Sequence, residues 1–210
     1  MLPRWLKPAL FVLSLVPFVR LFVLGFQDGL GANPIEFVTH STGFWTLTLL
    51  CLTLTITPLR RLSGWQAVIR LRRMLGLFAF FYALAHFVTY LWFDQWFSLE
   101  EIGKDIWKRP FITVGFAAFL LLIPLAVTST NRMMRKLGRR WIQLHRLIYL
   151  IVVLGVLHFW WLKEDKNDLA EPIWFSIAVL TLLSFRLLYP LWQRRGKVRK
   201  PGPAGGVLRP

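Results

Sequence analysis

Cysteine is almost absent from this chain of 210 residues, in which Cys51 is the single example. One thiol cannot build an intramolecular disulfide, an iron–sulfur cluster or a thiolate zinc site. Histidine is then the strong metal ligand that remains. The chain has four histidines, which are His40, His86, His145 and His158.

Acidic residues are also scarce, with ten against 26 lysines and arginines and a formal net charge of +16. None of the ten lies inside an apolar segment, whereas a proton path through a membrane usually includes buried acids. The basic residues stand in blocks beside the apolar segments, where anionic lipid and membrane topology account for them. Because no nucleic-acid recognition module accompanies this charge, nucleic-acid binding is not expected.

Apolar residues, by contrast, make up 56% of the chain, and the mean hydropathy is +0.52. No period-2 alternation runs through the apolar stretches, and helices are the other structure that satisfies its backbone within lipid. The sequence therefore predicts an all-α fold, a polytopic bundle of six transmembrane helices over residues 1–192. The expected spans are about 8–26, 44–58, 74–93, 111–128, 147–162 and 173–189. Residues 193–210 are expected to form a basic, disordered tail, and no internal repeat is evident.

The connections between these spans alternate in charge. Lysine and arginine gather on one side of the membrane, and all ten acids fall on the other. By the positive-inside rule the basic side faces the cytoplasm, and both termini lie there with it.

Two histidines stand at matched depth inside apolar spans. His86 follows Arg73 by thirteen residues and His158 follows Arg146 by twelve, which places both roughly 18 to 20 Å from the basic edge of a core about 30 Å thick. This pairing predicts a buried haem with His86 and His158 as axial iron ligands. Ligation by two imidazoles leaves no open iron position and favours one-electron transfer. The alternative for each histidine is a hydrogen-bonded residue within a membrane helix.

Small residues share a helical stripe with each histidine. Gly76, Ala79 and Ala83 precede His86 by ten, seven and three residues, and Gly155 precedes His158 by three. Such residues clear a slot for a flat macrocycle, although they also promote close helix packing in lipid.

The other two histidines each have more than one candidate role. His145 is a candidate ligand of a second, stacked haem, so two haems are an alternative to one. It lies roughly 140° around an ideal helix from His158, which disfavours this second site. A place beside a quinone or flavin, or an interfacial structural role, is open for it. His40 comes just before the second span, where Ser41 or Thr42 is expected to cap the helix. It is interpreted as structural, with a haem or quinone role as the alternative.

Arg20 lies well inside the first span, where a charged residue usually has a partner. It follows Lys7 by thirteen residues, which is the depth expected for the haem. A haem propionate is one candidate partner, and snorkelling to the interface is the ordinary alternative.

Several polar stretches carry a resemblance to a known family. They are GLGANP at 29–34, ITPLRR at 56–61, RRMLGL at 72–77, AHFVTY at 85–90, KRPFITVG at 108–115 and TSTNRMMRKLGRRWIQLHRLIYL at 128–150. Through them the chain resembles, over most of its length, the MsrQ (YedZ) family of haem-binding membrane subunits. That family is similar to the ferric reductase transmembrane domain.

This resemblance implies more than the residues alone indicate. It implies b-type haem, FMN, the bacterial inner membrane, and electron transfer from the respiratory quinone pool to MsrP, a periplasmic molybdopterin enzyme that repairs oxidised methionines. The family's important histidines fall on His86, His145 and His158. Arg73 belongs to a basic block that could hold a flavin or lipid phosphate, or serve topology alone. The redox subunit would leave substrate reduction to its partner.

Two functions from other classes are weighed against this one. A haem-dependent metal or oxygen reductase would need a separate cytosolic flavin reductase, because no Gly-x-Gly-x-x-Gly stretch follows a strand here. A haem-free transporter or scaffold, in which the histidines satisfy one another, is disfavoured by the placement of the acids.

Overall fold

The computed structural model describes residues 3–94, 96–164 and 168–198, and this part of the chain is helical without strands. Six spans are long and apolar enough to cross a membrane, so the predicted all-α bundle of six transmembrane helices is confirmed. The main helices of these spans are α1 (Leu6–Phe26), α2 (Pro34–Ser63), α3 (Arg72–Thr89), α5 (Pro110–Val127), α8 (Ile148–Glu164) and α9 (Ala170–Val198). The chain is a multi-pass membrane protein.

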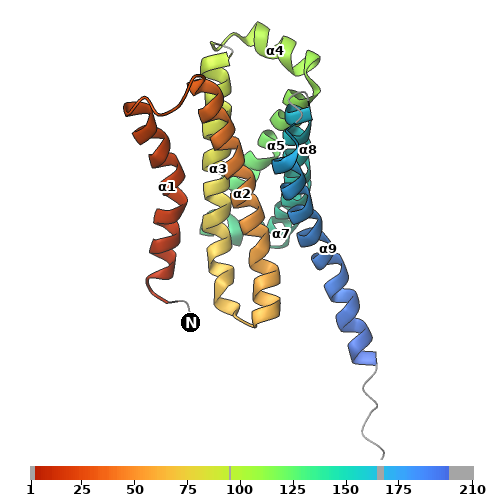
Figure 1. The fold of residues 1–210 in the computed structure, drawn as a ribbon. Coiled ribbons are helices and arrows are strands. Elements are labelled where there is room, and N and C mark those ends of the chain that lie inside the picture. Colours follow the sequence, from red (N-terminus) through yellow and green to blue (C-terminus); the bar gives the residue numbers. More distant parts are fainter. Residues whose placement is uncertain (1–2, 95, 165–167, 199–210) are drawn as a thin grey trace, which may run out of the picture.

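Short helices fill the connections. The amphipathic α4 (Leu99–Lys108) joins α3 to α5 at the top of Figure 1, and α6 (Asn131–Leu137) and α7 (Arg139–Leu144) lie between α5 and α8. Short 3₁₀- or π-helical elements extend two spans. They are η1 (Gln66–Leu71) and η2 (Tyr90–Asp94) around α3, and η3 (His145–Leu147) before α8. Apolar length does not reveal an amphipathic helix such as α4, so the sequence analysis did not predict it.

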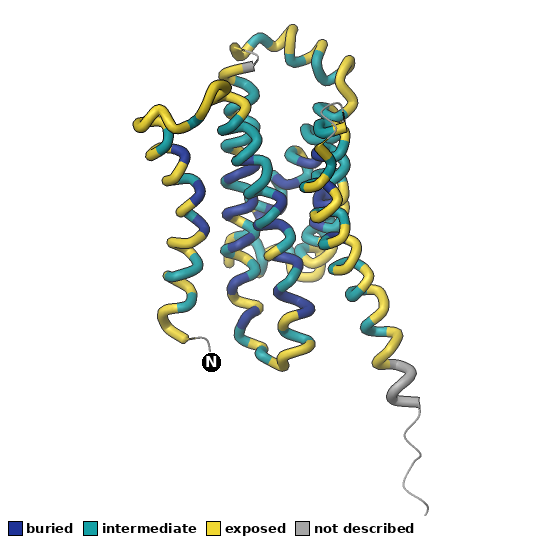
Figure 2. Tube along the Cα trace, viewed as in Figure 1, coloured by how far each residue is buried: buried dark blue, intermediate teal, exposed yellow. Residues whose placement is uncertain are grey.

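The bundle consists of two antiparallel helix pairs with a helix outside each. The α2/α3 pair and the α5/α8 pair make the most extensive contacts, and α9 packs on α2 and α8. Figure 1 shows α1 outside the α2/α3 pair, and the start of α1 lies at the same end as the last turns of α9. Buried residues concentrate in the middle of the two pairs (Figure 2), where Leu54 and Tyr82 have no exposed surface.

Helix α2 begins ten residues before the predicted span. The Asn33 side chain accepts a hydrogen bond from the Glu36 N–H at 3.2 Å, and Pro34 occupies the first turn, so this segment carries a strong helix start. The expected cap by Ser41 or Thr42 is therefore wrong. Thr42 instead donates back to the Val38 carbonyl within the helix at 2.8 Å.

A tyrosine ties the outer helix α1 to the bundle. The Tyr82 hydroxyl on α3 donates to the Ser14 carbonyl at 2.8 Å and accepts from the Phe18 N–H at 3.0 Å. Those two backbone groups would bond to each other in an uninterrupted helix. The hydroxyl is thus inserted into the α1 ladder, where it fixes both the depth and the rotation of α1.

Helix α9 is held by an arginine that points into the bundle. Arg186 donates to the Tyr149 hydroxyl and to the Leu54 carbonyl, each at 2.8 Å. Pro58, four residues after Leu54, has no N–H to offer that carbonyl, so the guanidinium supplies the missing donor. Helix α9 also continues through residues 193–198, which the sequence analysis assigned to the tail. Residues 199–210 lie outside the described part.

Candidate cofactor site between the two helix pairs

A cavity of about 490 Å³ lies between the α2/α3 and α5/α8 pairs. Its volume falls in the usual range for cofactor sites, about 300 to 1,000 Å³. The wall is mostly apolar and includes Leu50, Phe87 and Phe116, while Ile102 and Ile106 of α4 close one end. His86 and His158 both line this cavity, so the structure brings the two predicted ligands together.

His86 is held by two contacts with α2. Its Nδ1 lies 2.8 Å from the Thr39 carbonyl oxygen, and because a carbonyl can only accept, Nδ1 carries the proton and donates. The face of the ring lies against Gly43, where an added Cβ would stand 3.1 Å from Cε1 of the imidazole.

His158 is held by the same two kinds of contact with α5. Its Nδ1 donates to the Phe111 carbonyl at 2.7 Å. Gly115 lies against the ring more tightly still, since a Cβ there would stand 2.6 Å from Nδ1. Each imidazole is therefore clamped by a carbonyl and a glycine one helical turn apart on the facing helix.

The two clamps repeat along the chain with a constant spacing. The bonded carbonyl precedes its histidine by 47 residues in both cases. Adding 72 to residues 39, 43 and 86 gives 111, 115 and 158, and the dipeptides Gly-Phe and His-Phe recur at this offset. The expectation of no internal repeat is therefore wrong. The repeat is hard to see in the sequence because few of its paired positions carry the same residue. Gly43 and Gly115, which the sequence analysis missed, could have been found from these paired dipeptides.

The imidazoles approach each other across the cavity. Their ring centroids are 6.1 Å apart and the ring planes meet at 80°. Among the described residues, neither Nε2 has a hydrogen-bond partner, so both keep an available lone pair. Metal–imidazole bonds of about 2.0 Å, the length seen with zinc, place two rings on opposite sides of one ion with centroids about 6 Å apart. Donation from the other ring nitrogen to a carbonyl is the usual support of a metal-ligating histidine, so this pair fits haem iron.

The predicted small-residue slot is only partly present. Ala83 and Gly155 line the cavity, but Gly76 and Ala79 do not. A Cβ at Gly155 would stand 2.8 Å from the Leu47 side chain, so this glycine also permits close packing of α8 on α2.

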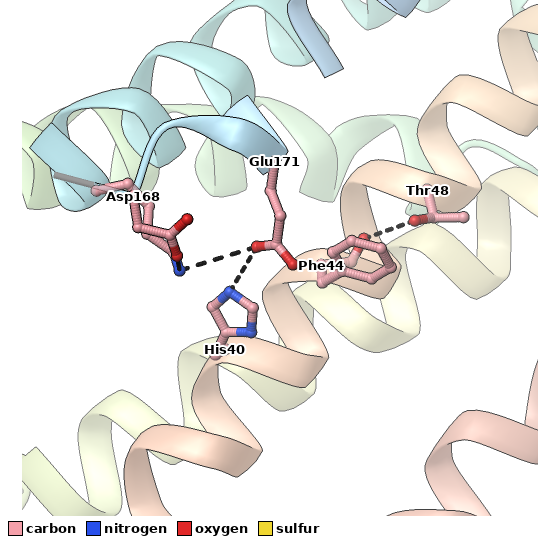
Figure 3. Close-up of polar contacts among 6 residues, drawn as sticks. His40, Phe44, Thr48, Asp168 and Glu171 are labelled. Atoms are coloured by element: carbon pink, nitrogen blue, oxygen red, sulfur yellow. Dashed lines mark hydrogen bonds and ion pairs between the residues drawn. The ribbon is translucent and has the colours of Figure 1, made fainter. Parts of the chain in front are cut away.

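The α4 end of the cavity carries a polar network around His40. His40 lines the cavity, and its Nε2 lies 3.0 Å from the Glu171 carboxylate of α9 (Figure 3). Lys163 donates to Asp168 at 2.7 Å and lies 3.9 Å from Glu171. The hydrogen bond and charge of Lys163 lower the pKa of the Asp168 carboxyl.

The remaining predicted positions lie away from the two clamped imidazoles. His145 is stacked on Trp141 with ring centroids 3.8 Å apart, and its buried Nε2 has no hydrogen-bond partner within the part of the chain that the structure describes. Arg73 donates to the Asn131 side chain. Arg20 is exposed on α1. Neither His145, Arg73 nor Arg20 is among the residues that line the cavity.

Comparison with known proteins connects this geometry to a family. The family model described as ferric reductase like transmembrane component matches residues 42–156. The chain is 59% identical over 193 residues to the protein-methionine-sulfoxide reductase heme-binding subunit MsrQ of Herminiimonas arsenicoxydans, covering 91% of this chain and 88% of that protein. Proteins of the same name from Bordetella pertussis and Ralstonia nicotianae are each 54% identical, over 92% and 99% of this chain and 94% and 98% of their own. No solved structure matches the chain.

Proposed function

Because the chain belongs to the ferric reductase-like transmembrane family and to its MsrQ branch, we propose that it is the haem-binding membrane subunit of a protein-methionine-sulfoxide reductase. His86 and His158 are the two axial ligands of one b-type haem in the cavity between the helix pairs. Held by two imidazoles with no open position, such a group supplies reversible one-electron transfer.

The observation that carries this proposal is the pair of clamped imidazoles. They come from different helix pairs, they lie 6.1 Å apart, and each donates from Nδ1 to a backbone carbonyl. A histidine whose only role is a hydrogen bond within the bundle does not require a second histidine, held in the same way, on the other side of a cavity. The Thr39 and Phe111 carbonyls fix the tautomer, so both rings present a basic Nε2 to the same space.

The helices around the cavity shield it from water, and the connections between them indicate its orientation in the membrane. Apolar walls from all four helices exclude water, and α4 covers one end with Ile102 and Ile106. The basic connections support an orientation across the bacterial inner membrane in which the opposite end, with both termini, faces the cytoplasm. The α4 end then faces the periplasm, where the catalytic partner, an MsrP-type molybdopterin enzyme, takes electrons.

The quinone pool is the proposed electron source. Reduction of a methionine sulfoxide to methionine and water takes two electrons and two protons, so one repair draws on two one-electron transfers and the oxidation of one quinol. FMN, with Arg73 as a candidate for its phosphate, and a cofactor role of His145 form part of this proposal through the family.

The first experiment is a reduced-minus-oxidised visible spectrum of the detergent-purified protein, with haem per chain measured as pyridine haemochrome. We expect a sharp low-spin b-type spectrum and one haem per chain. Added quinol should reduce this haem, and the oxidised partner enzyme should reoxidise it. Folded protein without haem, expressed with ample haem supply, would overturn the proposal.

A further inference from the structure

We propose that Gly43 and Gly115 are positioning residues, which set the orientation of the His86 and His158 imidazoles by lying directly against their rings. This role rests on the proposed haem function, and it concerns residues that do not themselves ligate. The 72-residue repeat is then a repeated ligand clamp, with the carbonyl and the glycine as its two parts.

The steric argument is strongest at Gly115. A Cβ at this position would lie 2.6 Å from Nδ1 and 2.8 Å from Cε1 of His158, well inside ordinary van der Waals contact. The obstructed Nδ1 is the atom that donates to Phe111 at 2.7 Å. The imidazole can relieve this contact by rotating about its two side-chain torsions, and that rotation carries Nδ1 away from the carbonyl.

Gly43 makes the same contact with more room. A Cβ there would lie 3.1 Å from Cε1 and 3.2 Å from Nδ1 of His86, so a shift of a few tenths of an ångström relieves it. The hydroxyl of Thr42, 3.5 Å from the same nitrogen, gives the tilted ring a second acceptor. We therefore expect Gly115→Ala to perturb its ligand more than Gly43→Ala does.

Other glycines show that these contacts are not a general property of the bundle. A Cβ at Gly76, on the same helix as His86, would meet nothing closer than a Thr53 methyl at 3.9 Å. At Gly29, between α1 and α2, a Cβ would meet the end of Leu24 at 3.0 Å. Gly76→Ala is thus a control for added bulk on a ligand-bearing helix. Gly29→Ala is a control for a tight contact that involves no imidazole.

The test uses the full chain, with two readouts. In haem-free protein, nitrogen NMR of isotope-labelled histidine reports which ring nitrogen carries the proton, with assignments from His86→Gln and His158→Gln. We expect the Nδ1–H form for both rings in the parent chain, and its loss for His158 in Gly115→Ala. In the haem-loaded protein, the largest g value of the low-spin EPR signal reports ligand orientation. It should shift in Gly43→Ala, and the low-spin signal should be lost in Gly115→Ala.

The two controls are expected to match the parent chain in both readouts. Unchanged tautomers and unchanged EPR spectra in Gly43→Ala and Gly115→Ala would overturn the positioning role. Equal changes in Gly29→Ala or Gly76→Ala would overturn it too, because the effect would then be one of general packing. If the parent chain contains no haem, the haem function fails, and the NMR readout still decides whether the glycines orient the rings.

Discussion

The α2/α3 pair and the α5/α8 pair hold one imidazole each by the same two contacts, but their surroundings differ. In the most apolar stretch of α2, 50% of the residues are buried, against 11% in that of α5. The α2/α3 pair also binds α1 through Tyr82. The α5/α8 pair instead has the tighter glycine, at Gly115. The tightness of the contact on each imidazole therefore does not follow how deeply its helix pair is buried.

The largest effect is expected from removing a proposed ligand on either side. His86→Ala and His158→Ala should each abolish low-spin haem while membrane insertion stays intact, because one imidazole cannot complete the site. Pyridine haemochrome and visible spectra of purified protein measure this. A normal low-spin spectrum in either variant would show that the two sides are not equivalent and would remove that residue from the ligand set.

A smaller effect is expected at one position of the repeat where the two helix pairs differ. The α2/α3 pair has Ala83 there, and the α5/α8 pair has Gly155, 72 residues later. Gly155→Ala forces a Cβ toward Leu47, and overpacking of this kind typically costs about 1 to 3 kcal/mol. Thermal unfolding in detergent should show a lower midpoint for Gly155→Ala. The matched change Ala83→Gly should instead cost no more than the intrinsic helix penalty of about 1 kcal/mol, and equal midpoints would contradict the packing difference.

Tyr82→Phe removes one link between the α2/α3 pair and α1 without touching the clamps. Loss of the hydroxyl leaves the Ser14 carbonyl and Phe18 N–H to bond each other, so we expect a cost of about 1 kcal/mol and faster proteolysis in the connection after α1. Haem content should remain that of the parent. Haem loss would show that α1 supports the site as well as the outer surface.

The smallest effect is expected at the α4 end of the cavity. His40 lies there, and Ile112 is the residue that corresponds to it in the repeat. His40→Ile removes a partly exposed hydrogen bond with the Glu171 carboxylate, and partly exposed contacts of this kind contribute about 0.2 to 1 kcal/mol. The low-spin spectrum should be retained and the unfolding midpoint should fall slightly. A lost spectrum would assign His40 to the cofactor itself.

Much of the fold was predictable because the thickness of the lipid core sets the length of an apolar span, and basic blocks mark the ends of the spans. The depth of His86 and His158 could likewise be counted from Arg73 and Arg146. The start of α2 was missed because its first turns are polar and depend on the Asn33 cap. The glycine clamps were not predicted because the small residues near His86 and His158 in sequence lie on the same helices as these histidines. The clamping glycines lie on the facing helices instead.

The repeated clamp has a consequence for how a cofactor is seated. A protoporphyrin ring carries its vinyl groups unsymmetrically, so its two faces differ. The two helix pairs offer those faces the same imidazole, glycine and phenylalanine, and the choice of face falls to unmatched side chains such as His40 and Ile112. Haem should accordingly occupy the cavity as two orientational isomers, in a ratio set at the α4 end.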